Sequence, residues 1–87
     1  MEINKNIIVI NDDEGKVVLK IGNSDKFIKM SKIEYDIIEY YIEVYDKNEV
    51  IQHFKNIIQI DLVSLNLLID KSAENGIITK HTVNKNF

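Results

Sequence analysis

The chain has 87 residues, of which 29 % are charged, a net charge of −3, no cysteine and no proline. This length fits one domain with a modest core, and the lack of cysteine excludes disulfides, thiolate metal sites and cysteine nucleophiles. The acidic balance argues against a nucleic-acid module, because binding to phosphates needs a basic patch. No signal-like segment and no apolar run of about twenty residues is present, so we expect a cytoplasmic protein with no membrane partner.

The first third of the chain predicts three strands joined by short turns, after a lead-in over residues 1–6. β-branched and apolar residues favour strands over residues 7–10, 17–21 and 26–30. Short connections make these strands an antiparallel meander. Alternation places Ile28 and Met30 on one face of the third strand, and Phe27 and Lys29 on the other. The third strand is an edge that no local segment covers.

The rest of the chain has helical period. Ser31 and Glu34 form a capping box that starts a helix over residues 32–45. Its apolar residues fall on two sides, which predicts a central helix. Asn48 is expected to cap a short helix over residues 49–55. Asp61 is expected to cap a third over residues 62–75, closed by Gly76 in a left-handed conformation.

In this third helix, one face is expected to meet the core, and it comprises Leu62, Leu65, Ile69, Ser72 and Ala73. Val63 and Leu67 lie roughly opposite and are more apolar than an outer face requires. A short extended piece over residues 77–79 follows. The predicted fold class is therefore α+β, a three-stranded antiparallel meander followed by three helices, with one domain over residues 1–79 and a polar tail over residues 80–87.

This order of elements resembles the PqqD-like peptide-binding domain, also called the RiPP recognition element. The resemblance covers roughly residues 17–79 and rests on segments 26–31, 33–38, 49–54, 60–62 and 75–78. Residues 46–48 lack the glycine that the family usually has between its first two helices. Ser72 stands where the family usually has a larger apolar residue. The resemblance implies a winged-helix-like unit that serves the biosynthesis of ribosomally made, modified peptides such as bacteriocins.

The resemblance also implies a mechanism. The leader of a precursor peptide is added as a strand to the third strand, in a groove shared with the third helix, and is presented to a modifying enzyme or leader peptidase. Such an adaptor needs no catalytic residue, cofactor or metal. The implied peptide-binding residues are Lys26, Phe27, Ile28, Lys29 and Met30 on the strand, and Val63, Asn66, Leu67, Asp70 and Lys71 on the helix.

Other interpretations of the same residues stay open. Lys26 and Lys29 either prevent edge-to-edge aggregation or meet acidic leader side chains, and Phe27 is either half core or a ligand contact. Val63 and Leu67 could pack on the tail or on a second copy, as a homodimer. His53 and His81 have no metal partner at ligand spacing, and the tyrosines at 35, 40, 41 and 45 are expected to pack in the core and at its rim.

Three function classes compete, ahead of an enzyme as a fourth. The adaptor comes first. A winged-helix DNA-binding regulator would need a basic third helix, and residues 62–75 hold one lysine against Asp70 and Glu74. A small dimeric interaction module would use the two-sided first helix and leave the edge strand idle. An enzyme comes last, because no nucleophile–base pair, phosphate loop or metal set is visible.

Overall fold

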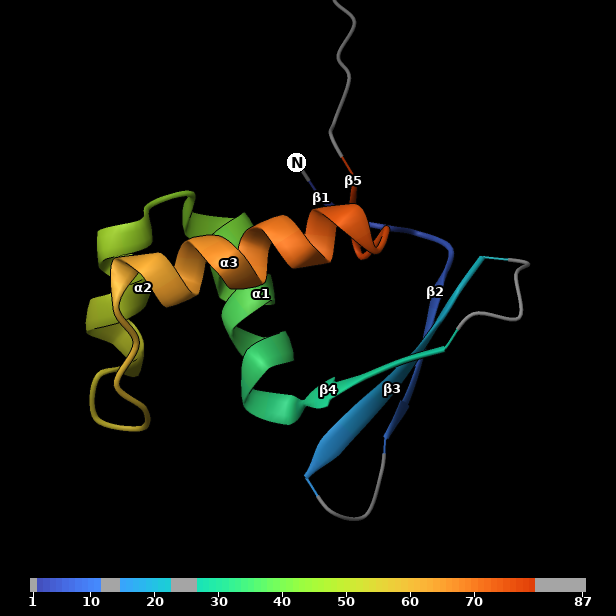
Figure 1. The fold of residues 1–87 in the computed structure, drawn as a ribbon, viewed down its shortest axis with the longest axis horizontal. Coiled ribbons are helices and arrows are strands. Elements are labelled where there is room, and N and C mark those ends of the chain that lie inside the picture. Colours follow the sequence, from blue (N-terminus) through green and yellow to red (C-terminus); the bar gives the residue numbers. More distant parts are fainter. Residues whose placement is uncertain (1, 12–14, 23–26, 80–87) are drawn as a thin grey trace, which may run out of the picture.

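The computed structural model describes residues 2–11, 15–22 and 27–79. Their helices and strands follow one another as an α+β chain (Figure 1). In order they are β1 (Glu2–Ile3), β2 (Ile7–Asn11), β3 (Lys16–Ile21), β4 (Phe27–Ser31), α1 (Lys32–Val44), α2 (Lys47–Phe54), α3 (Leu62–Glu74) and β5 (Ile78–Thr79). The predicted order of three strands and then three helices is confirmed. Of the turns predicted over residues 11–15 and 22–25, residues 12–14 and 23–25 lie outside the described residues, as do Lys26 and the polar tail.

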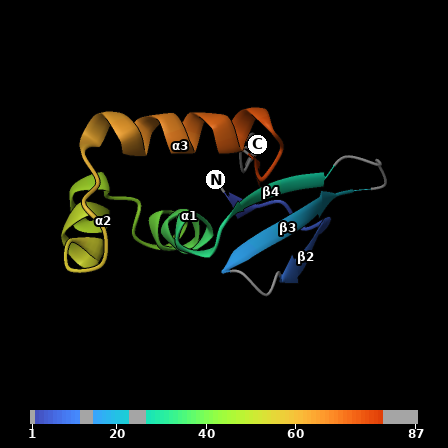
Figure 2. The ribbon, with the colours of Figure 1, turned by 60° about the horizontal axis from the view of Figure 1, so that its bottom comes forward.

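The main sheet is the antiparallel meander β2-β3-β4. Leu19 lies opposite Val9 on β2 and Ile28 on β4, and Val18 lies opposite Ile10 and Lys29. Val17 and Leu19 are buried, which confirms that alternate residues of β3 face the core. The helices lie on this side of the sheet, and no helix of the described residues covers the opposite side (Figures 1 and 2).

A second, two-stranded sheet joins the two ends of the described chain. β1 pairs antiparallel with β5, so that Ile3 lies opposite Ile78. The amide of Asn4 donates to the Ile77 carbonyl at 2.8 Å, and its side-chain Nδ2 donates to the Gly76 carbonyl at 2.9 Å. The prediction of a lead-in over residues 1–6 is therefore wrong for β1. Two residues are too short for a periodic signal, and their partner lies more than 70 residues away.

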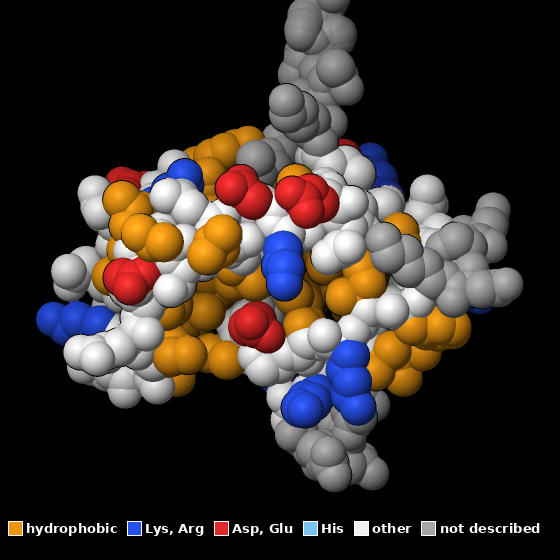
Figure 3. All heavy atoms as spheres, in the orientation of Figure 1, with side chains coloured by type: hydrophobic (Ala, Val, Ile, Leu, Met, Phe, Trp, Pro, Cys, Tyr) orange, Lys and Arg blue, Asp and Glu red, His pale blue; other side chains and the backbone are white. Residues whose placement is uncertain are grey.

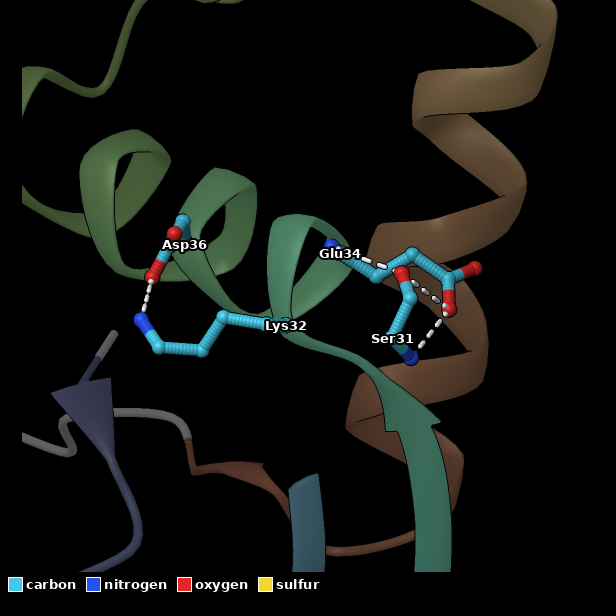
Figure 4. A network of polar contacts seen from close by, with 4 residues as sticks. All are labelled: Ser31, Lys32, Glu34 and Asp36. Atoms are coloured by element: carbon cyan, nitrogen blue, oxygen red, sulfur yellow. Dashed lines mark hydrogen bonds and ion pairs between the residues drawn. The ribbon is translucent and has the colours of Figure 1, made fainter. Parts of the chain in front are cut away.

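α1 starts at the predicted capping box. The Glu34 amide donates to Ser31 Oγ at 3.1 Å, and Glu34 Oε1 accepts from the Ser31 amide at 3.0 Å (Figure 4). An ion pair between Lys32 and Asp36 follows one turn later at 2.6 Å. Tyr35, Ile37, Ile38 and Tyr41 are buried, and α1 contacts the sheet, α2 and α3. The predicted central position of this helix is confirmed.

The start of α2 differs from the prediction. Asp46, and not Asn48, is the N-cap, and its Oδ1 accepts from the amides of Asn48 and Glu49 at 3.0 and 3.2 Å. The reason is the C-terminus of α1, where Tyr45 adopts the left-handed conformation (φ 58°) and turns the chain at once. The break between the two helices is therefore shorter than residues 46–48.

α3 has both predicted ends. Asp61 caps it by accepting from the Ser64 amide at 2.7 Å. Gly76 has φ +81°, with hydrogen bonds from Ile77 to Ser72 and from Gly76 to Ala73 that form a Schellman motif. Leu65, Ile69 and Ser72 are buried, but Leu62 and Ala73 are exposed, so the predicted core face is too wide. The row Leu65, Ile69 and Ser72, spaced i, i+4, i+7, is buried in the core, and Leu68 packs against it while partly exposed. No helix among the described residues has the length and apolar composition to cross a membrane.

Candidate functional site

The candidate site begins at β4, the last strand of the meander. Strand order places β3 on one side of β4 and no strand of the described chain on the other. The cause is local, because the capping serine Ser31 ends β4 and sends the chain directly into α1. β4 is therefore an edge strand, as predicted. An open strand edge is the element to which an extended peptide can add.

Alternation along β4 separates its side chains into two sets. Ile28 and Met30 are half-buried and pack against the core, whereas Phe27 and Lys29 are exposed. Phe27 is 58 % exposed, so the interpretation of Phe27 as half core is wrong. Its side chain lies on the face of the sheet that no helix covers.

A hollow of about 200 Å³ lies between β4 and α3. Its lining comes from β4, the first turn of α1, the C-terminal half of α3 and the segment after it. The residues are Ile28, Lys29, Met30, Glu34, Leu68, Lys71, Ser72, Asn75 and Ile77. In Figure 3, hydrophobic side chains are visible in the recess below α3, between that helix and the sheet. Four of the ten predicted site residues, Ile28, Lys29, Met30 and Lys71, meet here.

The other predicted residues of α3 do not line this hollow. Val63 and Leu67 are 68 % and 61 % exposed, and Asp70 is exposed. Asn66 is half-buried, and no described residue hydrogen-bonds to its buried Oδ1. Leu68, Lys71 and Ser72 form the helix row that faces β4. This row is rotated by about 100° from the predicted one, because each helical residue advances the wheel by that angle.

Ser72, which the sequence predicts on the core face of α3, also lines the hollow. It is 1 % exposed, and its Oγ donates to the Leu68 carbonyl at 2.8 Å. Its hydroxyl is thus already hydrogen-bonded within the helix, to the carbonyl four residues earlier, as is common for serine in helices. The small side chain leaves the hollow open where a leucine would occupy it. The sequence signal was the departure at Ser72 from the larger residue usual in the resembled family.

Two lysines and one glutamate border the hollow, whose other lining residues are apolar except for Ser72 and Asn75. Lys71 reaches it from α3, and Lys29 borders it at the strand edge, although alternation directs its side chain to the outer face. Glu34 Oε1 also accepts from Ser31 Oγ, at 3.1 Å, so this oxygen is fully used by the capping box (Figure 4). The hollow is suited to an apolar side chain with an acidic neighbour that meets a lysine.

The groove extends beyond the first hollow. A second hollow of about 260 Å³ shares Glu34 and Leu68 with it. Its remaining lining comes from α1, α3 and the connector between α2 and α3, and comprises Ile37, Ile58, Gln59, Ile60, Ser64 and Leu65. The two hollows together form a path beside α3 that begins at the open edge of β4 and is lined by both apolar and polar side chains.

A third hollow, of about 490 Å³, lies on the opposite flank of α1, against α2. It is lined by Asp36, Glu39, Tyr40, Glu43, His53 and Phe54. The rings of Tyr40 and His53 stack at 4.0 Å, and Tyr40 donates to Glu49 at 3.2 Å. Desolvation raises the pKa of the Tyr40 phenol, and the hydrogen bond to Glu49 raises it further. Among residues 2–11, 15–22 and 27–79, no three His, Cys, Asp or Glu side chains are placed to hold a metal ion. His81 lies outside these ranges.

Comparisons with known proteins identified no relative of this chain. A scan against protein-family models found no match, and searches of curated proteins and of solved structures found none either. The class that the described residues define is a small α+β domain with an open sheet edge beside an apolar groove. Its function is argued below from the groove itself.

Proposed function

We propose that this protein is a peptide-binding adaptor of the RiPP recognition element type. The leader of a precursor peptide adds as a strand to the open edge of β4, and alternate leader side chains enter the groove beside α3. The bound peptide is then presented to a modifying enzyme or leader peptidase in the cytoplasm. The adaptor itself supplies no chemistry and needs no cofactor. The winged-helix-like arrangement belongs to this proposal.

One observation carries the proposal, namely that the open edge of β4 and the hollow against α3 share Ile28, Lys29 and Met30. In β-augmentation the backbone supplies affinity and pockets for alternate side chains supply selectivity. Both parts are present at one place here. A strand added to β4 has alternate side chains on the same side as Ile28 and Met30, which is the side of the hollow.

The polarity of α3 supports this proposal over DNA binding. A recognition helix uses exposed basic residues to contact phosphates. The exposed side of α3 carries Val63, Leu67 and Asp70 instead, with Lys71 toward the groove. Such a helix is poorly suited to a phosphate backbone.

The first experiment is a binding titration. Fluorescence anisotropy would follow labelled N-terminal halves of the short precursor-like reading frames encoded beside the gene, with a random DNA duplex in parallel. We expect saturable binding, micromolar or tighter, to one leader and none to DNA. DNA binding with a steep salt dependence would reverse this ranking.

The mode of binding has its own test. Each amide of the bound leader is N-methylated in turn, which removes one hydrogen-bond donor from an added strand. We expect strong loss of affinity at alternate positions and little effect at the positions between them, because only every second amide of a strand faces its neighbour. A block of four consecutive sensitive amides, or no sensitive amide at all, would contradict strand addition.

The exposed residues of α3 favour a second candidate, a homodimeric interaction module. Val63 and Leu67, together with Leu62, form an apolar surface on the side of α3 away from the core. Sedimentation velocity on the free protein tests this candidate. A monomer that stays monomeric at high concentration removes it, whereas a dimer lost in Leu67→Lys supports it.

A further inference from the structure

The outer face of the main sheet is covered by no helix or strand of the described chain and lies outside the core. Strand register places Ile8, Lys20 and Phe27 side by side, and Ile10, Val18 and Lys29 in the next row. Ile8 and Ile10 are 55 % and 47 % exposed, and Phe27 is exposed to a similar extent. Three large hydrophobic side chains therefore stand in water on one face.

The helices do not cover this face. Val17 and Leu19 point to the opposite side, where they are buried against the helices. Two views show the sheet projecting from the helices with its outer face open (Figures 1 and 2). In the space-filling view, hydrophobic side chains gather beside Lys side chains over the sheet (Figure 3). None of Ile8, Ile10 and Phe27 belongs to the core cluster, so the fold does not require them to be apolar.

Charge on this face has one sign. Every charged residue in the described strands β2, β3 and β4 is a lysine, namely Lys16, Lys20 and Lys29. The protein as a whole carries −3. Carboxylates gather instead at α1 and α2, where Asp36, Glu39 and Glu43 line the third hollow and Glu49 lies beside it. Within the described strands, the sheet face is thus cationic and apolar on an acidic protein.

We propose that this face is a docking surface for a different protein, one that presents carboxylates together with large apolar side chains. Lysines interspersed with Ile8, Ile10 and Phe27 complement such a surface in both charge and hydrophobicity. The inference goes beyond the proposed function, since it holds whether or not a peptide binds at β4. In an adaptor, the acidic partner would be the enzyme that receives the peptide.

The same charges disfavour a second copy of this chain as the occupant. A second copy that docks through the same face would bring lysines against lysines, and one that docks through its acidic helices would form an open chain. An anionic bilayer would also meet the lysines, and the vesicle measurement below distinguishes it from an acidic protein.

The experiment is a selection of random dodecapeptides on the wild-type protein, followed by titration of each enriched peptide. Four proteins are compared: wild type, Ile10→Thr, Lys20→Glu and Ser72→Leu. Ile10 and Lys20 lie away from the β4 edge, and Ser72→Leu fills the groove only. We expect one enriched family that combines Asp or Glu with large apolar residues. This peptide family should bind Ile10→Thr and Lys20→Glu at least about tenfold more weakly than wild type. Its binding should weaken in high salt, and its affinity for Ser72→Leu should equal that for wild type.

Several outcomes would overturn the docking surface. Enriched peptides that respond only to Ser72→Leu would assign all binding to the groove, and basic or uncharged peptides would contradict the stated chemistry. A dimer that Lys20→Glu dissociates would assign the face to a second copy. Phosphatidylglycerol vesicles that bind wild type but not Ile10→Thr would assign it to lipid. Failure of this proposal leaves leader binding at β4 untouched, because leader titration against Ser72→Leu measures that site separately.

Discussion

At the scale of single residues, Ser72 decides the shape of the groove. It is buried, its hydroxyl is bonded to the Leu68 carbonyl, and its small volume leaves the hollow against β4 open. A larger apolar residue at this position would fill the hollow but would not touch the backbone hydrogen-bonding groups of β4. The residue therefore separates the two parts of the proposed mechanism, the pocket and the strand edge.

We predict that Ser72→Leu lowers leader affinity at least about tenfold while changing the free energy of unfolding by less than about 1.5 kcal/mol, because the hollow accepts the added volume. Anisotropy and urea unfolding measure the two quantities. Ser72→Ala is the matched control: it removes the same hydroxyl, leaves the hollow open and should bind nearly as wild type. Equal loss in both variants would show that the hydroxyl, and not the space, matters.

Asp61 gives a pH-dependent prediction. Hydrogen bonds from Ser64, from its amide first, lower the pKa of the Asp61 carboxyl. A lowered pKa in the folded state means that the stabilisation is complete above the unfolded value near 3.8 and is lost as pH falls through the folded value. Asp61→Asn keeps a capping oxygen but does not titrate.

The expected outcome is a difference between variants. Asp61→Ala should be less stable than Asp61→Asn at neutral pH, whereas wild type should lose stability relative to Asp61→Asn as pH falls from about 5 to about 2. Thermal unfolding followed by circular dichroism measures both. A wild type and Asp61→Asn that keep a constant difference over this range would contradict a titrating cap.

At the scale of elements, the junction between β4 and α1 joins the proposed binding edge to the central helix. Ser31 is the last residue of β4 and the cap of α1. The same serine thus ends the sheet and starts the helix. Glu34, its partner in the capping box, also lines both hollows of the groove.

We predict that Ser31→Ala destabilises the protein by about 0.5–2 kcal/mol, because the Glu34 amide at the start of α1 loses its acceptor, Ser31 Oγ. Urea unfolding followed by circular dichroism measures the loss. Ser31→Asp, which retains an acceptor at the cap, should recover most of it. If Ser31→Asp is as unstable as Ser31→Ala, the capping bond is not the source of the effect.

The pairing of β1 with β5 is the other element-scale feature. Asn4 connects the segment after β1 to the carbonyls of Gly76 and Ile77, directly after α3. We predict that Asn4→Ala costs about 1–2 kcal/mol, because a partly buried carbonyl loses its side-chain donor. Asn6→Ala is a control at a neighbouring position in the same segment. Chemical denaturation of both proteins tests this, and equal stability of the two variants would contradict it.

At the scale of the whole molecule, the described helices cover only one face of the main sheet. One face of the sheet packs on the helices around Leu19 and Ile38, both 0 % exposed. The other face carries Ile8, Ile10 and Phe27 in solvent. A three-stranded sheet needs only one covered face to be stable, so the outer face is available for binding.

This asymmetry predicts opposite mutational sensitivities for two isoleucines. Ile38→Ala should cost about 2–5 kcal/mol, because it leaves a cavity in the core. Ile10→Thr should change stability by no more than about 0.5 kcal/mol, because Ile10 lies on the exposed face and threonine favours strands equally. Urea midpoints measure both. A large cost for Ile10→Thr would mean that the outer face is structural and would remove its availability for docking.

Local patterns were sufficient for much of the fold. Alternation along residues 17–21 and 26–30 predicted the sheet and its faces, the capping box predicted the start of α1, and Asp61 and Gly76 predicted both ends of α3. Each of these signals depends on residues a few positions apart. The edge position of β4 also followed, since a meander leaves its last strand without a partner.

Tertiary structure alone decided what depends on distant partners. The β1–β5 pair joins residues more than 70 positions apart, and no two-residue strand has a period to read. The helix wheel could not say which flank of α3 faces β4, so Leu68 and Ser72 replaced Val63 and Leu67 in the groove. Likewise, the exposure of Phe27 depended on which face of the sheet the helices cover. The physical reason is the same in all three cases, because periodicity specifies which residues share a face but only packing specifies what that face meets.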